Sequence, residues 1–297
     1  MSANYTIPKI AFILQTHDAS PHLSRLCPIL KTFQHARVFS HHDFSKCRPH
    51  PALAEVAEFC EPHRKTAWAR VSQALATMDV LEFAARRMPE AEWFILLSAA
   101  CYPIKSAAHI EEFLAQTSEH GFLDINVARP GRDLPGWWWS KVFTRPFCRI
   151  PFISRHGKPY LRSIRIRRRS TPFNKQFRLL YGANWFILRR PTVERLLDNN
   201  PKEHPLVSFF DRVERAENKH MSLDECIVQT ILGQEGSSKL NQDPLRFIDW
   251  ENSKNWHPNI LTMNHWEAIQ RSNALFARKF DHMKSRELLD QIDAVIS

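Results

Sequence analysis

Two adjacent cations near the carboxyl end of the chain interrupt an apolar stretch. Arg278 and Lys279 lie in ALFARKFD, residues 274–281, whose other residues are mostly those of a protein core. The ordinary interpretation is a helix end, because Lys and Arg in a last helical turn complement the helix dipole. The alternative is an anion held at the edge of the core. The stretch taken alone favours the helix end.

Motifs of several common enzyme classes are absent. The chain has only seven glycines and neither GxGxxG nor GxxxxGK[ST], which argues against a glycine-rich phosphate loop. The histidines of residues 41–50, HHDFSKCRPH, match no structural zinc spacing and indicate a polar loop at a strand end. No Asp-x-Asp pair is present to hold a divalent ion on a sugar diphosphate. If the chain binds a nucleotide diphosphate, cations such as Arg278 and Lys279 must neutralise it.

The hydrophobic periodicities predict an α/β chain. In the first 130 residues four strands alternate with three helices, a pattern typical of a mostly parallel sheet. The strands are expected at 9–15, 36–43, 92–98 and 120–128, and the helices at 20–33, 66–88 and 106–116. Ser20 and Ser106 are the expected helix caps. The second half adds strands at 183–190 and 245–250 and helices at 191–198, 222–234, 264–276 and 285–296.

The positive charge is concentrated in one segment. The net charge is +10, but residues Leu134 to Val193 hold 14 Lys or Arg and no acidic residue, which leaves −4 for the rest of the chain. Residues 130–181 are rich in Pro, Arg and aromatic residues and show no clean period, so we expect an excursion of loops and short strands. Such a segment implies an acidic or membrane-bound partner.

Size and cysteine usage suit a cytosolic protein. The 297 residues are 43% hydrophobic, enough for one large domain or two small ones. Six cysteines occur without a Cys-x-x-Cys pair, which favours a reducing compartment. The amino-terminal apolar run is short and indicates a strand rather than a signal peptide. No run of about 18 apolar residues predicts a transmembrane helix.

Seven stretches, in this order, carry a resemblance: KIAFILQTHD, TAWARVSQALATM, WFILLSAACYPIKS, GANWFILRR, SLDECIVQTIL, LRFIDW and LFARKFD. Together they resemble the core-2/I-branching β-1,6-N-acetylglucosaminyltransferase family, which includes the peptide xylosyltransferases. The resemblance implies a single GT-A-like domain over residues 1–297, with a mostly parallel, twisted sheet flanked by helices. The basic excursion at about 130–181 would be an insertion. It also implies an inverting mechanism without a metal, in agreement with the missing Asp-x-Asp.

The resemblance assigns the two cations to the donor diphosphate. Lys279 matches the family lysine of FA-x-KF, and Arg278 is placed to join it. Two fixed cations can spread charge over a leaving UDP as a metal ion would. A second basic residue of the animal enzymes has no counterpart in NWHPNILT, residues 255–262, so Arg278 is expected to compensate.

The resemblance also suggests a general base. SLDE matches the family motif (P)DE and places the base at Glu225, which would remove the proton from the attacking hydroxyl. The residues alone favour a different role, because Ser222 and Glu225 have the spacing of a capping box. With the family context we favour the base.

Further candidate site residues follow from position. Asp43 closes a predicted strand where the family binds the nucleoside, although a turn-forming Asp is an equal alternative. Trp185 and Trp250 match family positions near the sugars, where a flat ring can stack on a sugar face. A buried core Trp is the alternative for both. One departure is Cys101, which stands in SAACYP where the family has Asp.

We therefore predict a metal-independent inverting glycosyltransferase, without a cofactor. It would move GlcNAc or xylose from a UDP-sugar to a saccharide or lipid-linked saccharide in bacterial polysaccharide or glycolipid assembly. The expected location is the cytoplasm, at the inner membrane face if Trp137 to Trp139 and the basic segment meet anionic lipid. One alternative is a catalytically inactive sugar-binding homologue, because of Cys101. The other is a nucleic-acid-binding protein built on RSIRIRRRSTPFNKQFR. Family motifs flank that segment on both sides, so no nucleic acid is expected.

Overall fold

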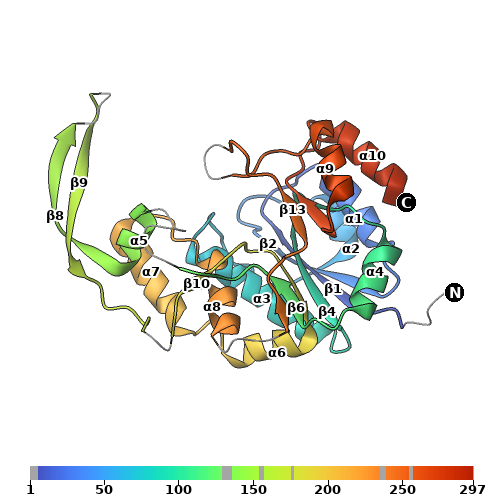
Figure 1. The fold of residues 1–297 in the computed structure, drawn as a ribbon, viewed down its shortest axis with the longest axis horizontal. Helices are drawn as coiled ribbons and strands as arrows, with labels where there is room; N and C mark the ends of the chain where they lie inside the picture. Colours follow the sequence, from blue (N-terminus) through green and yellow to red (C-terminus); the bar gives the residue numbers. More distant parts are fainter. Residues whose placement is uncertain are drawn as a thin grey trace.

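The computed structural model describes residues 6–128, 136–153, 157–174, 177–234, 239–253 and 257–296. A seven-stranded sheet lies at its centre, with strand order β12-β6-β11-β4-β1-β2-β3 (Figure 1). The strands are β1 (Ile10–Thr16), β2 (Ala36–His42), β3 (Ala57–Phe59), β4 (Trp93–Ser98), β6 (Gly121–Leu123), β11 (Phe186–Arg189) and β12 (Leu240–Asn241). Neighbours run parallel except at β11, which is antiparallel to β4 and β6. The prediction of a mostly parallel sheet is confirmed.

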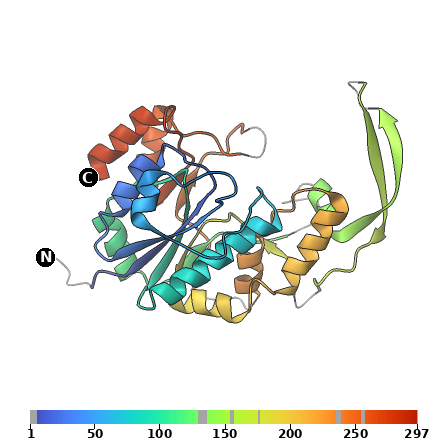
Figure 2. The same cartoon turned by 180° about the vertical axis from the view of Figure 1, so that it is seen from behind.

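Helices lie on both sides of this sheet (Figures 1 and 2). They are α1 (Leu23–Leu30), α2 (Pro51–Val56), α3 (Val71–Arg87), α4 (Ala107–Gln116), α6 (Arg190–Asp198), α7 (Pro205–Glu217), α8 (Ile227–Gly233), α9 (Trp266–Arg271) and α10 (Arg286–Ile296). The arrangement agrees with the GT-A-like fold that the resemblance implies. Every helix in the described ranges is too short or too polar to cross a bilayer.

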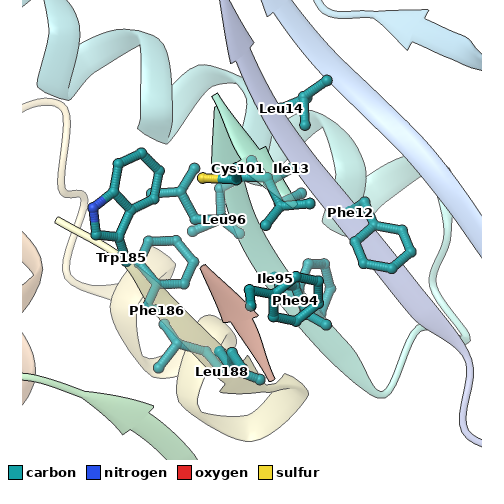
Figure 3. Packing of buried hydrophobic residues seen from close by; sticks show 14 of the residues in the cluster. Phe12, Ile13, Leu14, Phe94, Ile95, Leu96, Cys101, Trp185, Phe186 and Leu188 are labelled. Carbon is teal, nitrogen blue, oxygen red and sulfur yellow. The ribbon is translucent and has the colours of Figure 1, made fainter. Parts of the chain in front are cut away.

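The core forms where the apolar strands pair. Residues 10–14 of β1 and 93–97 of β4 are completely buried, as their uninterrupted apolar runs predict. Phe12 meets Phe33 edge-on, with ring centroids 5.0 Å apart. Side chains from β1, β4 and β11 pack together in Figure 3. Burial of each such side chain contributes about 1.5–3 kcal/mol.

A second, three-stranded sheet corrects the helix end expected at Arg278 and Lys279. Its order is β13 (Arg246–Ile248), β14 (Phe276–Arg278) and β5 (Cys101–Pro103). Helix α9 ends at Arg271, and Phe276 to Arg278 then form a central strand, parallel to β13 and antiparallel to β5. Ladder hydrogen bonds on both sides thus override the local preference of this stretch for a helix end.

Two predicted helices begin later than expected. Residues 66–70 are a loop and α3 starts at Val71, because Ala69 adopts a left-handed φ of 54° and its carbonyl accepts hydrogen bonds from distant backbone groups. Ser20 does not cap α1: the amide of Leu23 bonds to the Ser20 carbonyl in a turn, and His22 takes the cap position. Ser106 does cap α4, as predicted, since its hydroxyl accepts from the amide of His109.

Outside the basic segment, two of the described helices were not predicted. Both α2 and α7 begin with the dipeptide His-Pro, and in each the His side chain accepts a hydrogen bond from the second residue after it. Pro at the first helical position is the feature of the sequence that could have predicted the start of both helices.

The basic segment is more regular than the sequence suggests. After α5 (Gly136–Phe143), strands β8 (Thr144–Ile153) and β9 (Pro159–Arg168) pair antiparallel over ten residues each. We call this pair the basic hairpin. It stands away from the rest of the chain in both views (Figures 1 and 2). At its root β7 (Asn126–Val127) pairs with β10 (Leu180–Tyr181).

Candidate active site

A cleft of about 340 Å³ opens at the carboxyl ends of the parallel strands. Thr16 at the end of β1, His41 near the end of β2 and Ser98 at the end of β4 line it. Ligands of open α/β sheets bind in this location. The opposite wall contains Glu225, which comes from a part of the chain more than 100 residues later.

Glu225 ends η1 (Leu223–Glu225), a short 3-10 helix that precedes α8. Its carbonyl accepts a hydrogen bond from the amide of Gly182, at 2.9 Å. A Cβ atom at Gly182 would lie 1.9 Å from the carbonyl oxygen of Asp124, so only glycine allows this close approach. The carboxyl of Asp124 accepts the next amide, that of Ala183, at 2.8 Å. The segment that positions Glu225 is therefore tightly fixed.

The capping-box alternative for Glu225 is wrong. Ser222 has a left-handed φ of 50° and its side chain makes no cap hydrogen bond. Its amide and that of Met221 both donate to the carbonyl of Ala69, at 2.9 and 3.1 Å. This turn ties η1 to the loop before α3 and leaves the Glu225 side chain exposed to the cleft.

The carboxyl of Glu225 is poised to hold a proton. Burial by the cleft walls raises its pKa, Arg278 opposes this shift, and Asp124 adds to it. Its neighbour Asp224 is 7% exposed, and burial followed by the charge of Glu225 raises the pKa of Asp224 as well. Oδ1 of Asp224 has no hydrogen-bond partner among the described residues. A base with a raised pKa in a cleft suits proton transfer near neutral pH.

Arg278 brings positive charge to the same cleft, and Lys279 follows it in the chain without itself lining the cleft. Arg278 lines the cleft at the end of β14, with its guanidinium 4.2 Å from the ring centroid of Trp185. Burial lowers the pKa of Arg278, but a guanidinium stays charged in proteins. Burial lowers the pKa of Lys279, and the nearby charge of Arg278 lowers it further. Burial also lowers the pKa of His257, a residue of the cleft lining, and the charges of Lys279 and Arg278 add to that shift. The cations therefore lie close together.

Arg246 is a buried cation that sequence reasoning missed. It is 7% exposed, donates to the carbonyl of Leu96 at 3.0 Å, and lies 5.7 Å from the Trp185 ring centroid. Burial lowers the pKa of Arg246 to about 10, so it remains a cation at neutral pH. The sequence did not single it out, because its place depends on the pairing of β13 with β14.

No carboxylate forms an ion pair with Arg246 or Arg278 within the described ranges. Nε of both side chains lacks a hydrogen-bond partner there, as does Nη1 of Arg246. Cys101 is completely buried beside them and is the cross-strand partner of Arg278. Cys101, the residue that departs from the family pattern in the resemblance, thus lies where a carboxylate could have paired with these arginines, and a bound anion could balance their charge.

Asp43 is not among the residues that line the cleft, but it holds two residues that do. It is buried at the end of β2, and its oxygens accept from the amide and hydroxyl of Ser45 and of Thr66, at distances between 2.6 and 3.1 Å. Burial alone would raise its pKa, but these hydrogen bonds hold the pKa of Asp43 below its ordinary value. Thr66 and Lys46, whose ammonium is 3.6 Å from Asp43, line the cleft in its place. A direct contact of Asp43 with the nucleoside stays a prediction.

Among the described residues three tryptophans line the cleft, and they differ in exposure. Trp250 is 52% exposed and free to present a ring face, whereas Trp185 is 8% exposed and packs against the core. Trp68, which the sequence assigned to a helix, is 51% exposed and contacts His257, with ring centroids 5.1 Å apart. The sequence did not indicate that Trp68 lines a cleft, because residues 66–70 continue the helical periodicity of α3.

Carboxylates, histidines and cysteines nowhere gather in threes that could hold a metal ion in the described part of the chain. The model of the Core-2/I-Branching enzyme family matches residues 55–272. The chain belongs to this family. The resemblance drawn from the seven stretches is thereby confirmed.

Relatives of this core-2/I-branching chain include two plant enzymes. The β-glucuronosyltransferase GlcAT14B of Arabidopsis thaliana is 27% identical over 218 residues, which are 68% of this chain and 43% of that protein. GlcAT14A of the same plant is 28% identical over 207 residues, or 68% of this chain and 42% of that protein. The chain thus spans less than half the length of these relatives. A solved glycosyltransferase involved in glycosylation of the major capsid of PBCV-1 aligns with 96% of this chain at a TM-score of 0.40 and 11% identity.

Proposed function

We propose that this chain is an inverting glycosyltransferase that needs no metal and moves a sugar from a UDP-sugar to a saccharide hydroxyl. The observation that supports the proposal best is the shared cleft of Glu225 and Arg278: a carboxyl with a raised pKa faces a space that is also lined by a half-buried cation. Membership of the core-2/I-branching family supports the reaction class.

Glu225 would act as the general base. Its carboxylate takes the proton of the acceptor hydroxyl while the hydroxyl oxygen forms a bond to the anomeric carbon. The bond from that carbon to the UDP oxygen breaks at the same time, and its electron pair leaves with UDP. Attack from the face opposite UDP inverts the configuration.

Arg278 and Lys279 would stabilise the leaving diphosphate. Arg278 lines the cleft, Lys279 follows it in the chain, and Nε of Arg278 has no partner among the described residues. A preorganised cation in a partly dry site stabilises developing negative charge more strongly than it would in water.

The donor sugar we propose first is GlcNAc or xylose, following the family resemblance. Glucuronic acid is a second candidate, which two observations favour. The named relatives are β-glucuronosyltransferases, and Arg278 at the cleft has no carboxylate ion partner in the described ranges. A sugar carboxylate would supply one.

The acceptor we propose is a saccharide, free or lipid-linked, in bacterial polysaccharide or glycolipid assembly. Trp68 and Trp250 are both about half exposed within the cleft. Flat aromatic rings present apolar surface to sugar faces while the sugar hydroxyls stay solvated.

A donor screen tests the proposal. UDP release is measured with UDP-GlcNAc, UDP-xylose and UDP-glucuronic acid, each with EDTA, with and without mixed oligosaccharides. The expected result is release from one donor, stimulated by a saccharide, and lost in Glu225→Gln. Glu267→Gln is the matched control, because that side chain is 78% exposed and outside the cleft. UDP binding without turnover of any donor would instead identify a catalytically inactive sugar-binding protein.

A further inference from the structure

The basic hairpin, strands β8 and β9, projects far from the cleft-bearing body of the chain (Figures 1 and 2). Ten extended residues per strand give it a length of about 33 Å. At its root Arg169 forms an ion pair with Glu217 of α7, at 2.8 Å, with both side chains largely buried. The hairpin is thus anchored at its root, and its ribbon projects away from the body (Figures 1 and 2).

The outer end of the hairpin exposes apolar side chains. Ile153 is 70% exposed and Phe152 is 43% exposed, and Pro151 and Pro159 beside them are exposed too. A two-stranded hairpin is only marginally stable in water by itself. An exposed apolar tip on such an element indicates a surface that is covered when the protein works.

The same hairpin carries one sign of charge only. Its strands hold six arginines, namely Arg145, Arg149, Arg162, Arg165, Arg167 and Arg168, and no acidic residue. In the strand register Arg145 is opposite Arg167. Like charges at directly opposite positions destabilise a strand pair. An anionic surface around the hairpin would remove that cost.

We infer that the basic hairpin docks on an anionic lipid surface, with the apolar tip in the headgroup region. Arg149 and Arg162 lie a few residues behind the tip in the strand register. Apolar residues of surface-bound segments enter about 5–10 Å into the interface, and anionic lipids attract Lys and Arg that lie near it. A soluble acidic saccharide would match the charge but would leave Phe152 and Ile153 in water.

Binding to vesicles tests the inference without any donor or activity. The full chain is sedimented with phosphatidylcholine vesicles and with vesicles that also contain phosphatidylglycerol, at low and at physiological salt. Binding to the anionic vesicles alone, weakened by salt, is expected. No binding to either kind of vesicle overturns the inference. Binding only to a soluble acidic polysaccharide overturns it in favour of that partner.

Two pairs of variants separate charge from insertion. Arg149→Gln with Arg162→Gln should lower the partition coefficient roughly 25-fold, at about fivefold per cation. Phe152→Ser with Ile153→Ser should lower it about tenfold or more at unchanged charge. Met283→Ser and Arg271→Gln are matched controls outside the hairpin, 71% and 80% exposed, and should bind as the wild type. If the tip variant also binds as the wild type, the tip does not enter the interface and the inference fails.

Discussion

At the scale of single residues, the cleft brings two carboxyl groups and a cation close together. Glu225 and Asp224 are adjacent carboxyls with raised pKa values, and Arg278 is the cation that opposes the shift at Glu225. Such paired environments are typical of sites that transfer protons. Of the residues that the family resemblance singled out, Glu225 and Arg278 both line the cleft, and Lys279 follows Arg278 in the chain.

The pH dependence of transfer should report Glu225. The base must be deprotonated, so activity should fall as the pH drops through its raised pKa. The acid limb of kcat/KM should therefore lie clearly above the pKa of about 4.3 of an ordinary glutamate. The measurement is the pH profile of kcat/KM with the donor found in the screen. An acid limb at the ordinary value would mean that Glu225 is not the base, or that its burial is relieved.

Lys279→Ala should weaken UDP binding. A hydrogen bond to a charged group contributes about 1.5–3 kcal/mol, which corresponds to roughly a tenfold to hundredfold loss of affinity. Lys279→Arg should lose less unless the compact ammonium is required. Calorimetric titration with UDP measures both, and Lys284→Ala, at an exposed lysine nearby, is the control. Equal affinities for Lys279→Ala and the wild type would remove Lys279 from the donor site.

Cys101→Asp should restore a missing counter-charge. A carboxylate beside Arg246 and Arg278 can accept from guanidinium groups that now lack partners in the described ranges. We expect a gain of about 1 kcal/mol in the free energy of unfolding and weaker UDP binding, because the new carboxylate neutralises part of the charge. Denaturant unfolding and UDP titration measure these effects.

The neutral variant Cys101→Asn has a similar size and controls for packing. A greater loss of stability for Cys101→Asp than for Cys101→Asn would show that the two arginines need no carboxylate. That outcome would also weaken the case for an acidic donor sugar.

At the scale of elements, the site depends on backbone contacts between segments far apart in the sequence. Ala69 joins the loop before α3 to η1, and Gly182 joins the end of β10 to both Asp124 and Glu225. Because these contacts join distant segments, the local sequence pattern predicted the wrong structure for the loop before α3. Helical periodicity extends from residue 66, yet the left-handed Ala69 places Trp68 in the cleft instead.

Gly182→Ala should disturb the site as well as the fold. A methyl group 1.9 Å from a backbone oxygen forces the two segments apart, at a cost of about 1–3 kcal/mol in the free energy of unfolding. A shift of the catalytic group by about 1 Å can reduce turnover roughly 10²-fold. Thermal unfolding and kcat measure these effects. Gly157→Asn is the control, since that turn has open space and Asn tolerates its φ of 74°. An active, equally stable Gly182→Ala would contradict the close approach.

At the scale of the whole molecule, the sequence predicted the parallel sheet because several of its strands are uninterrupted apolar runs. Such runs are typical of parallel strands that are buried on both faces. It did not predict β14, since Phe276 to Arg278 becomes a strand only through its two neighbours. The reversed strand β11 and the hidden cation Arg246 likewise depend on pairing across the fold. The cleft itself unites the ends of β1, β2 and β4 with residues of the carboxyl-terminal half.

The central claim is that protein cations and Glu225 replace a metal ion and its ligands. The most direct test is transfer by the wild type and by Glu225→Gln in EDTA, followed by addition of Mn²⁺. We predict full wild-type turnover in EDTA, no gain from Mn²⁺, and a loss of roughly 10²–10⁴ in kcat for Glu225→Gln with UDP affinity nearly unchanged. Turnover that disappears in EDTA and returns with Mn²⁺, or a Glu225→Gln variant with near-normal kcat, would contradict it.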